Sequence, residues 1–187
     1  TAKEDYRNFL QSAPEKNRIY LEQALDAVEY RKTKNKDVSF GYSAKNDAVV
    51  YNPSHPDFSN MDFAISMTHE LGHRVDIFFA NSWESLEFSQ AIAVGKEIIA
   101  QNPQEFTDYA KQNDKEGALS DILDAISAGE YRFPFRHDMD YWEQEGIKEK
   151  EIFANLFTLE TLQDTAKLRW FQNKFPDIWK AYQSFTS

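Results

Sequence analysis

The chain contains 187 residues with a formal net charge of −10, and 41% of its residues are hydrophobic and 15% aromatic. This apolar content excludes a disordered chain, and the length is enough to bury about 70% of the unfolded surface, so we expect residues 1–187 to form a single domain. The absence of cysteine excludes disulfide bonds and thiolate metal sites, and the negative charge argues against nucleic acid as a partner, because phosphate binding needs clustered Lys and Arg.

The sequence also lacks the features of a membrane or secreted chain. No run approaches about 18 apolar residues, and residues 1–5 are polar where a signal peptide needs an apolar core. We therefore expect no membrane partner. The start at Thr1 rather than Met is compatible with a processed product or a piece of a longer polypeptide.

The first third of the chain predicts a helix followed by a β-hairpin. Apolar residues at helical intervals predict a helix over residues 14–32, and the basic cluster 31–36 would lie at its end, where cations favour the helix dipole. Apolar and polar residues alternate over 38–42, and residues 47–51 are rich in β-branched side chains, which predicts two strands. The turn-forming residues 43–46 between them favour a hairpin.

The rest of the chain is mostly helical in its pattern. An apolar run without proline predicts a long helix over residues 61–80, with Ser59 and Asn60 as its caps. Residues 131–140 contain a proline and no periodicity, which predicts an ordered loop suited to cover a cleft. Further helices are predicted over residues 85–102, 103–112, 119–128, 148–162, 164–173 and 176–185. The expected fold is therefore α+β and mostly helical.

Residues 69–73 read HELGH, an HExxH motif on the predicted apolar helix. Residues four apart on a helix are neighbours, so His69 and His73 can bind one zinc ion while Glu70 faces the adjacent solvent position. Gly72 is a poor helix former, about 1 kcal/mol worse than Ala, which predicts that another element packs closely against the helix here. The alternative interpretation is that both histidines are only hydrogen-bonded to neighbours on a helix face.

A catalytic zinc site needs a third protein ligand. Glu151 is favoured because Ala154 and Asn155 lie three and four positions after it. A small residue in that stripe lets two helices approach, and a polar residue can hydrogen-bond a carboxylate or imidazole that binds the metal. The pattern therefore predicts a helix that brings Glu151 to the two histidines.

Other interpretations of this ligand stay open. Asp76 follows His73 by three residues on the same helix, where a third ligand strains tetrahedral geometry, so we expect Asp76 near the metal without binding it. Glu149 and His137 are other candidates for the third ligand. Glu149 and Glu151 could also be only solvated charges on an amphipathic helix.

The HELGH run, followed far downstream by the pattern ExxAxxF over residues 151–157, resembles the gluzincin arrangement of zinc metallopeptidases. More narrowly, residues 119–129, 137–142 and 149–157 are similar to the metallopeptidase-like domain near the C-termini of phage minor head (head morphogenesis) proteins. This resemblance covers about residues 40–160. It implies a zincin-like fold, with a small antiparallel sheet or hairpin beside the HExxH helix, and a peptidase site without a known substrate. The departures from that group are Asn155 and Leu156, where a bulkier aromatic or acidic continuation is expected.

The expected activity is zinc-dependent hydrolysis of peptide bonds by an endopeptidase. Zn²⁺ held by His69, His73 and Glu151 would lower the pKa of its bound water towards about 7. Glu70 would accept the proton as the water attacks a peptide carbonyl, and would later protonate the leaving amine.

His137 and Tyr141 are the candidates to hold the oxyanion in this reaction, because a donor from a loop over the site supplies that contact in zinc peptidases. The alternative is that Tyr141 is a packing anchor and His137 an ordinary surface residue. The sequence does not choose between these interpretations.

Two other functions share these residues. The chain could be a structural or assembly module of a phage head protein with a retained zinc site, or a zincin-type toxin or effector domain. A fourth protein ligand such as Asp76 or His137 would favour the structural module, and an open water position would favour the peptidase. The expected partners are a peptide or protein substrate and other phage head proteins, and the expected location is the cytoplasm of the bacterial host or the virion.

Overall fold

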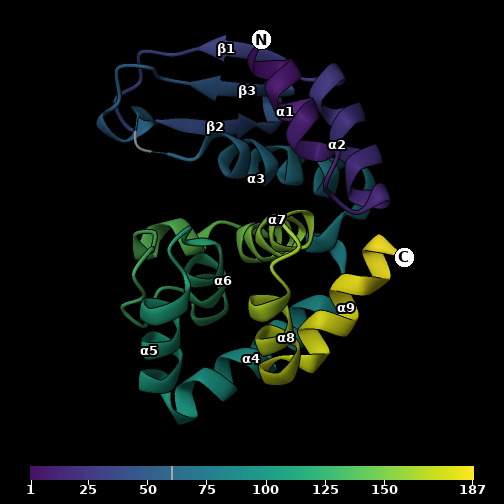
Figure 1. Ribbon diagram of the computed structural model, residues 1–187. Coiled ribbons are helices and arrows are strands. Elements are labelled where there is room, and N and C mark those ends of the chain that lie inside the picture. Colours follow the sequence, from purple (N-terminus) through teal and green to yellow (C-terminus); the bar gives the residue numbers. More distant parts are fainter. Residues whose placement is uncertain (60) are drawn as a thin grey trace.

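Two layers make up the molecule, one formed by a small sheet with the N-terminal helices and the other by the C-terminal helices (Figure 1). The computed structural model describes residues 1–59 and 61–187. The strands are β1 (Glu29–Lys32), β2 (Phe40–Ser43) and β3 (Ala48–Tyr51). The helices are α1 (Ala2–Leu10), α2 (Glu15–Ala27), α3 (Phe63–Val75), α4 (Leu86–Gln101), α5 (Pro103–Asn113), α6 (Ala118–Ser127), α7 (Ile147–Thr161), α8 (Thr165–Lys174) and α9 (Pro176–Thr186). The fold is thus α+β and mostly helical, as the sequence predicts.

The sheet has the strand order β1-β3-β2, so β3 is central and β2 lies at an edge. β2 pairs antiparallel with β3, with Phe40 opposite Tyr51 and Ser43 opposite Ala48, which confirms the predicted hairpin. β1 pairs parallel with β3 on its other side. The expected small antiparallel sheet or hairpin is therefore present as the β2–β3 pair, and the parallel strand β1 is an addition that the sequence did not predict.

The predicted helix over residues 14–32 is wrong in its last part. α2 ends before Val28, which is extended (φ −72°, ψ 146°), and β1 follows. The reason is a long-range hydrogen-bonding partner, because the Glu29 N–H donates to the Asp47 carbonyl at 3.1 Å. Helical periodicity is a local pattern and contains no information about β3. Arg31 consequently lies in a strand rather than at a helix end, where it pairs with Glu29 at 2.6 Å.

The HExxH helix starts later than predicted and has a different cap. Asp62 is the N-cap of α3, and its carboxylate accepts hydrogen bonds from the N–H groups of Ala64 (3.0 Å) and Ile65 (3.1 Å). A carboxylate at this position satisfies free N–H groups and favours the helix dipole. Ser59, predicted as a cap, lies in a short 3₁₀ turn, and the other predicted cap, Asn60, lies outside the described residues.

The other predicted helices are confirmed to within one residue at either end, and α1 was not among the predicted elements. α3 continues past Val75 as a wider π turn over Asp76–Ala80, which ends at Asn81 in the left-handed conformation (φ 53°). Residues 130–138 form a loop without helix or strand, as expected for this segment. Among the described helices, none has the length and apolar character needed to cross a bilayer.

The two layers approach each other closely where α3 packs against α7. A Cβ atom added to Gly72 of α3 would lie 3.3 Å from the Cα and 3.5 Å from the Cβ of Ala154 in α7. Both residues are fully packed against each other's helix, and Ala154 is 0% exposed. The prediction that Gly72 marks a close contact is confirmed, and this contact sets the distance between the HExxH motif and α7.

We expect Gly72→Val to lower the free energy of unfolding by about 1–3 kcal/mol, because the added methyl groups must push α3 away from α7. Urea unfolding followed by circular dichroism measures this change. The matched control is Gly41→Val, since no atom lies within 4 Å of the position a Cβ would take at Gly41. Equal unfolding midpoints for the two variants would show that the contact at Gly72 does not limit the packing of the helices.

Candidate metal centre

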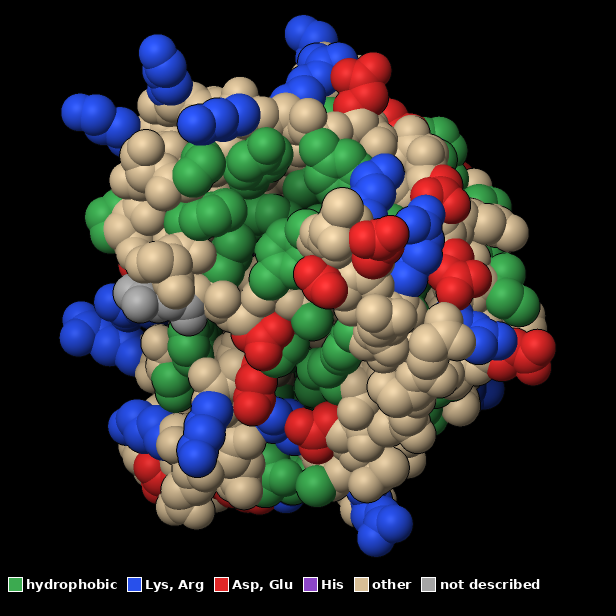
Figure 2. Space-filling view, turned by 45° about the horizontal axis from the view of Figure 1, so that its top comes forward, with side chains coloured by type: hydrophobic (Ala, Val, Ile, Leu, Met, Phe, Trp, Pro, Cys, Tyr) green, Lys and Arg blue, Asp and Glu red, His purple; other side chains and the backbone are tan. Residues whose placement is uncertain are grey.

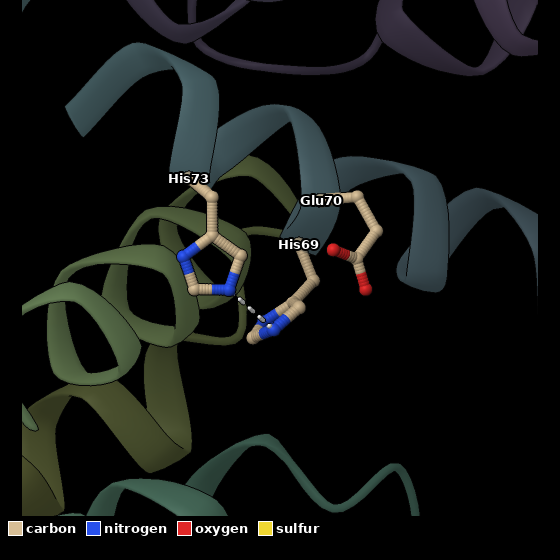
Figure 3. A group of neighbouring side chains, drawn as sticks. All are labelled: His69, Glu70 and His73. Atoms are coloured by element: carbon tan, nitrogen blue, oxygen red, sulfur yellow. Dashed lines mark hydrogen bonds between the residues drawn. The ribbon is translucent and has the colours of Figure 1, made fainter. Parts of the chain in front are cut away.

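The two histidines of the HExxH motif project from the same side of α3 (Figure 3). Their Nε2 atoms lie 3.1 Å apart, and the ring planes are nearly perpendicular, with centroids separated by 4.6 Å. Placed this way, the two rings bring one nitrogen of each imidazole to a common point. Spacing by four residues on a helix is the cause, as the sequence predicts for His69 and His73.

Glu151 completes this group from the opposite layer. Its Oε2 atom lies 3.4 Å from Nε2 of His69 and 3.5 Å from Nε2 of His73. The side chain is buried, and among the described residues Oε2 has no hydrogen-bond partner. A buried acceptor without a donor is costly, unless a cation binds it. The three atoms therefore form a small triangle of nitrogen and oxygen ligands that fits a divalent metal ion.

The neighbouring side chains shift the pKa of Glu151 and the pKa of His69 in opposite directions. Burial raises the pKa of the Glu151 carboxyl, but the adjacent His73 and His69 imidazoles outweigh burial and hold this pKa well below its usual value. Burial lowers the pKa of His69, whereas the Glu151 carboxylate raises it, with a net value of about 10. The surrounding carboxylates therefore favour a positive charge at the centre of the triangle.

Glu70 lies next to the triangle rather than in it. Its side chain projects from α3 in a different direction from the two imidazoles (Figure 3). Its carboxylate lies within 4.8 Å of a ring nitrogen of His69 and of His73. Two hollows of ≈ 330 and ≈ 360 Å³ meet at this place, and Glu70 and His69 line both. The carboxylate is thus placed to act on a small molecule beside the metal.

Tyr141 holds the carboxylate of Glu151. The Tyr141 hydroxyl donates a hydrogen bond to Oε1 of Glu151, which leaves Oε2 directed at the histidines. Burial and the nearby Glu151 carboxylate raise the pKa of Tyr141, so the phenol keeps the proton that it donates. The sequence predicted Tyr141 as an oxyanion donor near the metal, and the structure shows it as a hydrogen-bond partner of Glu151, the candidate third ligand.

His137 lies over the same cleft on the loop that follows α6. Its ring stacks on the ring of Tyr141, with centroids 4.0 Å apart and an interplanar angle of 18°. Its Nε2 lies 3.2 Å from Oδ1 of Asp121. Burial lowers the pKa of His137, but the Asp121 carboxylate outweighs burial and raises this pKa above its usual value. His137 is therefore a side chain over the cleft that is paired with Asp121, and it is not one of the three triangle residues.

Asp121 is the residue of the site to which the sequence analysis gave no role. One of its carboxylate oxygens lies within 4.8 Å of the ligand atoms of His69 and Glu151. Both oxygens already have partners, because Oδ1 faces His137 and Oδ2 accepts a hydrogen bond of 2.7 Å from Asn155. The available signal was a pair of carboxylates, Asp121 and Asp124, on a largely apolar helix, and the pattern does not show which of the two reaches the site.

The hydrogen-bond partners of Asn155 differ from the predicted ones. It was expected to hydrogen-bond a carboxylate or imidazole that binds the metal, but its Nδ2 donates to Asp121 and, at 3.0 Å, to the main-chain carbonyl of Glu151. The physical reason is helical spacing, because a side chain four residues after Glu151 reaches the Glu151 carbonyl of its own helix. Asn155 therefore positions Asp121 rather than the metal ligand.

The other candidate ligands point elsewhere. The buried Asp76 carboxylate accepts hydrogen bonds from the N–H (2.8 Å) and hydroxyl (2.7 Å) of Ser82, and burial raises its pKa to about 6. Glu149 accepts a hydrogen bond of 2.9 Å from Ser89 of α4. Glu149 and Glu151 are both buried, so the interpretation of these acids as solvated charges is wrong.

Comparisons of the chain with protein-family models, with curated proteins and with solved structures find no match.

Proposed function

We propose that this protein is a zinc-dependent peptidase. The observation that carries the proposal is the triangle formed by Nε2 of His69, Nε2 of His73 and Oε2 of Glu151, with edges of 3.1, 3.4 and 3.5 Å. In a tetrahedral zinc site with ligand distances of about 2.0–2.1 Å, ligand atoms lie about 3.3–3.4 Å apart. Two histidines and one glutamate are also a ligand set that leaves a fourth position for water in catalytic zinc sites.

The chemistry of peptide hydrolysis divides among the side chains around this triangle. A zinc ion supplies Lewis acidity there, which lowers the pKa of water towards about 7 and polarises a carbonyl group. Glu70 accepts the proton of the attacking water and passes it to the leaving amine. The imidazole of His137, held by Asp121, donates a hydrogen bond to the carbonyl oxygen as negative charge develops on it.

The cleft also offers a place for an extended peptide. Phe40, the first residue of β2, lines both hollows that flank Glu70. β2 pairs with β3 on one side only within the described sheet, so its other edge has main-chain groups available to a further strand. A peptide bound along β2 would pass beside Glu70 and the metal ligands.

A structural or assembly module, such as a part of a phage head, is the second candidate, and one observation favours it. Asp121 has a carboxylate oxygen within 4.8 Å of the ligand atoms of His69 and Glu151, so it is the residue that would close the metal site as a fourth ligand. The hydrogen bond from Asn155 and the contact with His137 support the open site instead, because each engages one oxygen of the Asp121 carboxylate.

We expect the purified protein to bind one zinc ion per chain. His69→Ala, His73→Ala and Glu151→Ala each remove one ligand, so each lowers zinc affinity by more than about 100-fold, as measured by competition with a chromogenic chelator. Asp121→Asn separates the two candidates, because the open site predicts zinc affinity within about tenfold of the wild type. A loss as large as that of Glu151→Ala would identify a closed, structural site.

Glu70→Gln should retain zinc and lose hydrolysis by about 10²–10⁴-fold, since the amide cannot accept the proton of water. The measurements are zinc content by mass spectrometry and cleavage of a fluorogenic peptide mixture, with and without chelator. His73→Ala is the control that loses zinc and activity together. Equal zinc loss in both variants would contradict the role of Glu70 as general base.

Tyr141→Phe and His137→Ala should affect different quantities. Tyr141 orients a metal ligand, so Tyr141→Phe should weaken zinc binding by about 10–100-fold. His137 contacts the substrate oxygen in this proposal, so His137→Ala should lower kcat by about 10²–10³-fold at full zinc occupancy. Zinc titration together with steady-state kinetics tests both expectations, and a loss of zinc in His137→Ala with unchanged Tyr141→Phe would reverse these assignments.

A further inference from the structure

A third hollow, lined by aromatic rings, lies outside the metal centre. It has a volume of ≈ 340 Å³ and is bounded by the sheet and by the first residues of α1 and α3. An apolar cavity of about 150 Å³ is large enough to hold benzene, so this hollow has room for a large side chain. The aromatic residues that line it are Tyr30, Phe40, Tyr51, Phe58 and Phe63.

Two polar side chains at this hollow, those of Lys3 and Tyr30, already have partners. The Lys3 amine donates to the main-chain carbonyl of Leu25 at 3.1 Å and lies 4.7 Å from the centre of the Tyr30 ring. The Tyr30 hydroxyl donates to the same carbonyl at 3.2 Å. No carboxylate is among the described residues that line the hollow. The surface it offers to a ligand is therefore mostly carbon, which selects for an apolar group.

The aromatic hollow adjoins the cleft of the metal centre through one side chain. Phe40 lines the aromatic hollow and also both hollows that flank Glu70. Within the aromatic hollow, the Phe40 ring packs edge to face against the Phe63 ring, with centroids 6.0 Å apart. A chain extended along β2 therefore reaches this hollow where the strand begins.

The chemistry of the two regions differs sharply. The cleft beside Glu70 is lined by three further carboxylates, those of Asp57, Glu116 and Asp121. The described residues that line the aromatic hollow include no carboxylate. Figure 2 shows the same division, with hydrophobic side chains gathered over the upper part of this face and acidic side chains near its middle. A peptide bound across both regions would place some residues in the acidic cleft and others in the apolar hollow. The protein would therefore prefer different side chains at different positions of the peptide.

On the basis of the proposed peptidase function, we propose that the aromatic hollow is a specificity pocket for one large apolar side chain, such as phenylalanine, of the bound peptide. A peptide is the occupant that the continuity with the cleft favours. A second copy of this chain would need a broad face, because a stable interface buries about 800 Å² on each partner, whereas this hollow is a confined pocket.

The test uses zinc-loaded Glu70→Gln protein, which keeps peptides intact, and a series of labelled extended peptides in which a single phenylalanine moves through an alanine and serine background. Fluorescence anisotropy gives each dissociation constant. We expect one position at which phenylalanine binds about 10–100-fold more tightly than alanine. A benzoylphenylalanine at that position should crosslink, on illumination, to Tyr51, Phe58 or Phe63.

Two further variants in this background locate the preference. Ala2→Trp introduces a large side chain at the rim of the hollow, and Phe58→Ala removes part of its wall, so each should abolish the preference for phenylalanine. Ala93→Trp is the matched control, because Ala93 is an exposed alanine on α4 that lines none of the three hollows. Circular dichroism and zinc content verify that each variant is folded and loaded.

Three results would overturn the specificity pocket. These are equal binding of the phenylalanine and alanine peptides, a preference that survives both Ala2→Trp and Phe58→Ala, and sedimentation that shows a dimer abolished by Ala2→Trp. Cleavage by the wild type without a positional preference would refute this pocket and leave the peptidase function standing. Absence of both peptide binding and cleavage would refute the two proposals together.

Discussion

The contact between Gly72 and Ala154 is the constraint on which the rest of the site depends. α3 carries His69, Glu70 and His73, whereas α7 carries Glu151, and the two helices meet where a Cβ on Gly72 would lie 3.3 Å from the Ala154 Cα. A side chain on residue 72 would force α3 and α7 apart by a few tenths of an ångström or more, which is comparable with the tolerance of a metal site, about half an ångström. Glycine lowers the stability of a helix. At position 72 it allows α3 to approach α7 closely enough for the candidate ligands to meet.

The burial of Glu151 has a second consequence. A buried carboxylate is unfavourable unless its oxygens are paired, and the protein pairs only one of them, through Tyr141. Oε2 faces the two histidines instead, so the carboxylate, the phenol and the imidazoles all favour a cation at one point. The same principle separates Asp121 from the ligands, because both of its oxygens have partners of their own.

Local patterns in the sequence were sufficient for much of this arrangement. The HExxH spacing placed His69 and His73 together because helical geometry is local, and Glu151 was found through the small residue that must lie beside it. β1 was missed because a strand is stabilised by a partner distant in sequence. The position of Asp121 depends on how α6 packs against α7, which no periodicity within α6 records.

The same dependence on packing links metal binding to the folded state. His69 and His73 belong to the layer that contains the sheet, and Glu151, Asp121 and Tyr141 to the layer below it. The unfolded chain has no preformed site, so the free energy of binding a metal ion there would add to the stability of the folded state. It does so at one place, the interface between α3 and α7. A metal ion held there would stabilise the same helix contact that brings its ligands together, and each would strengthen the other.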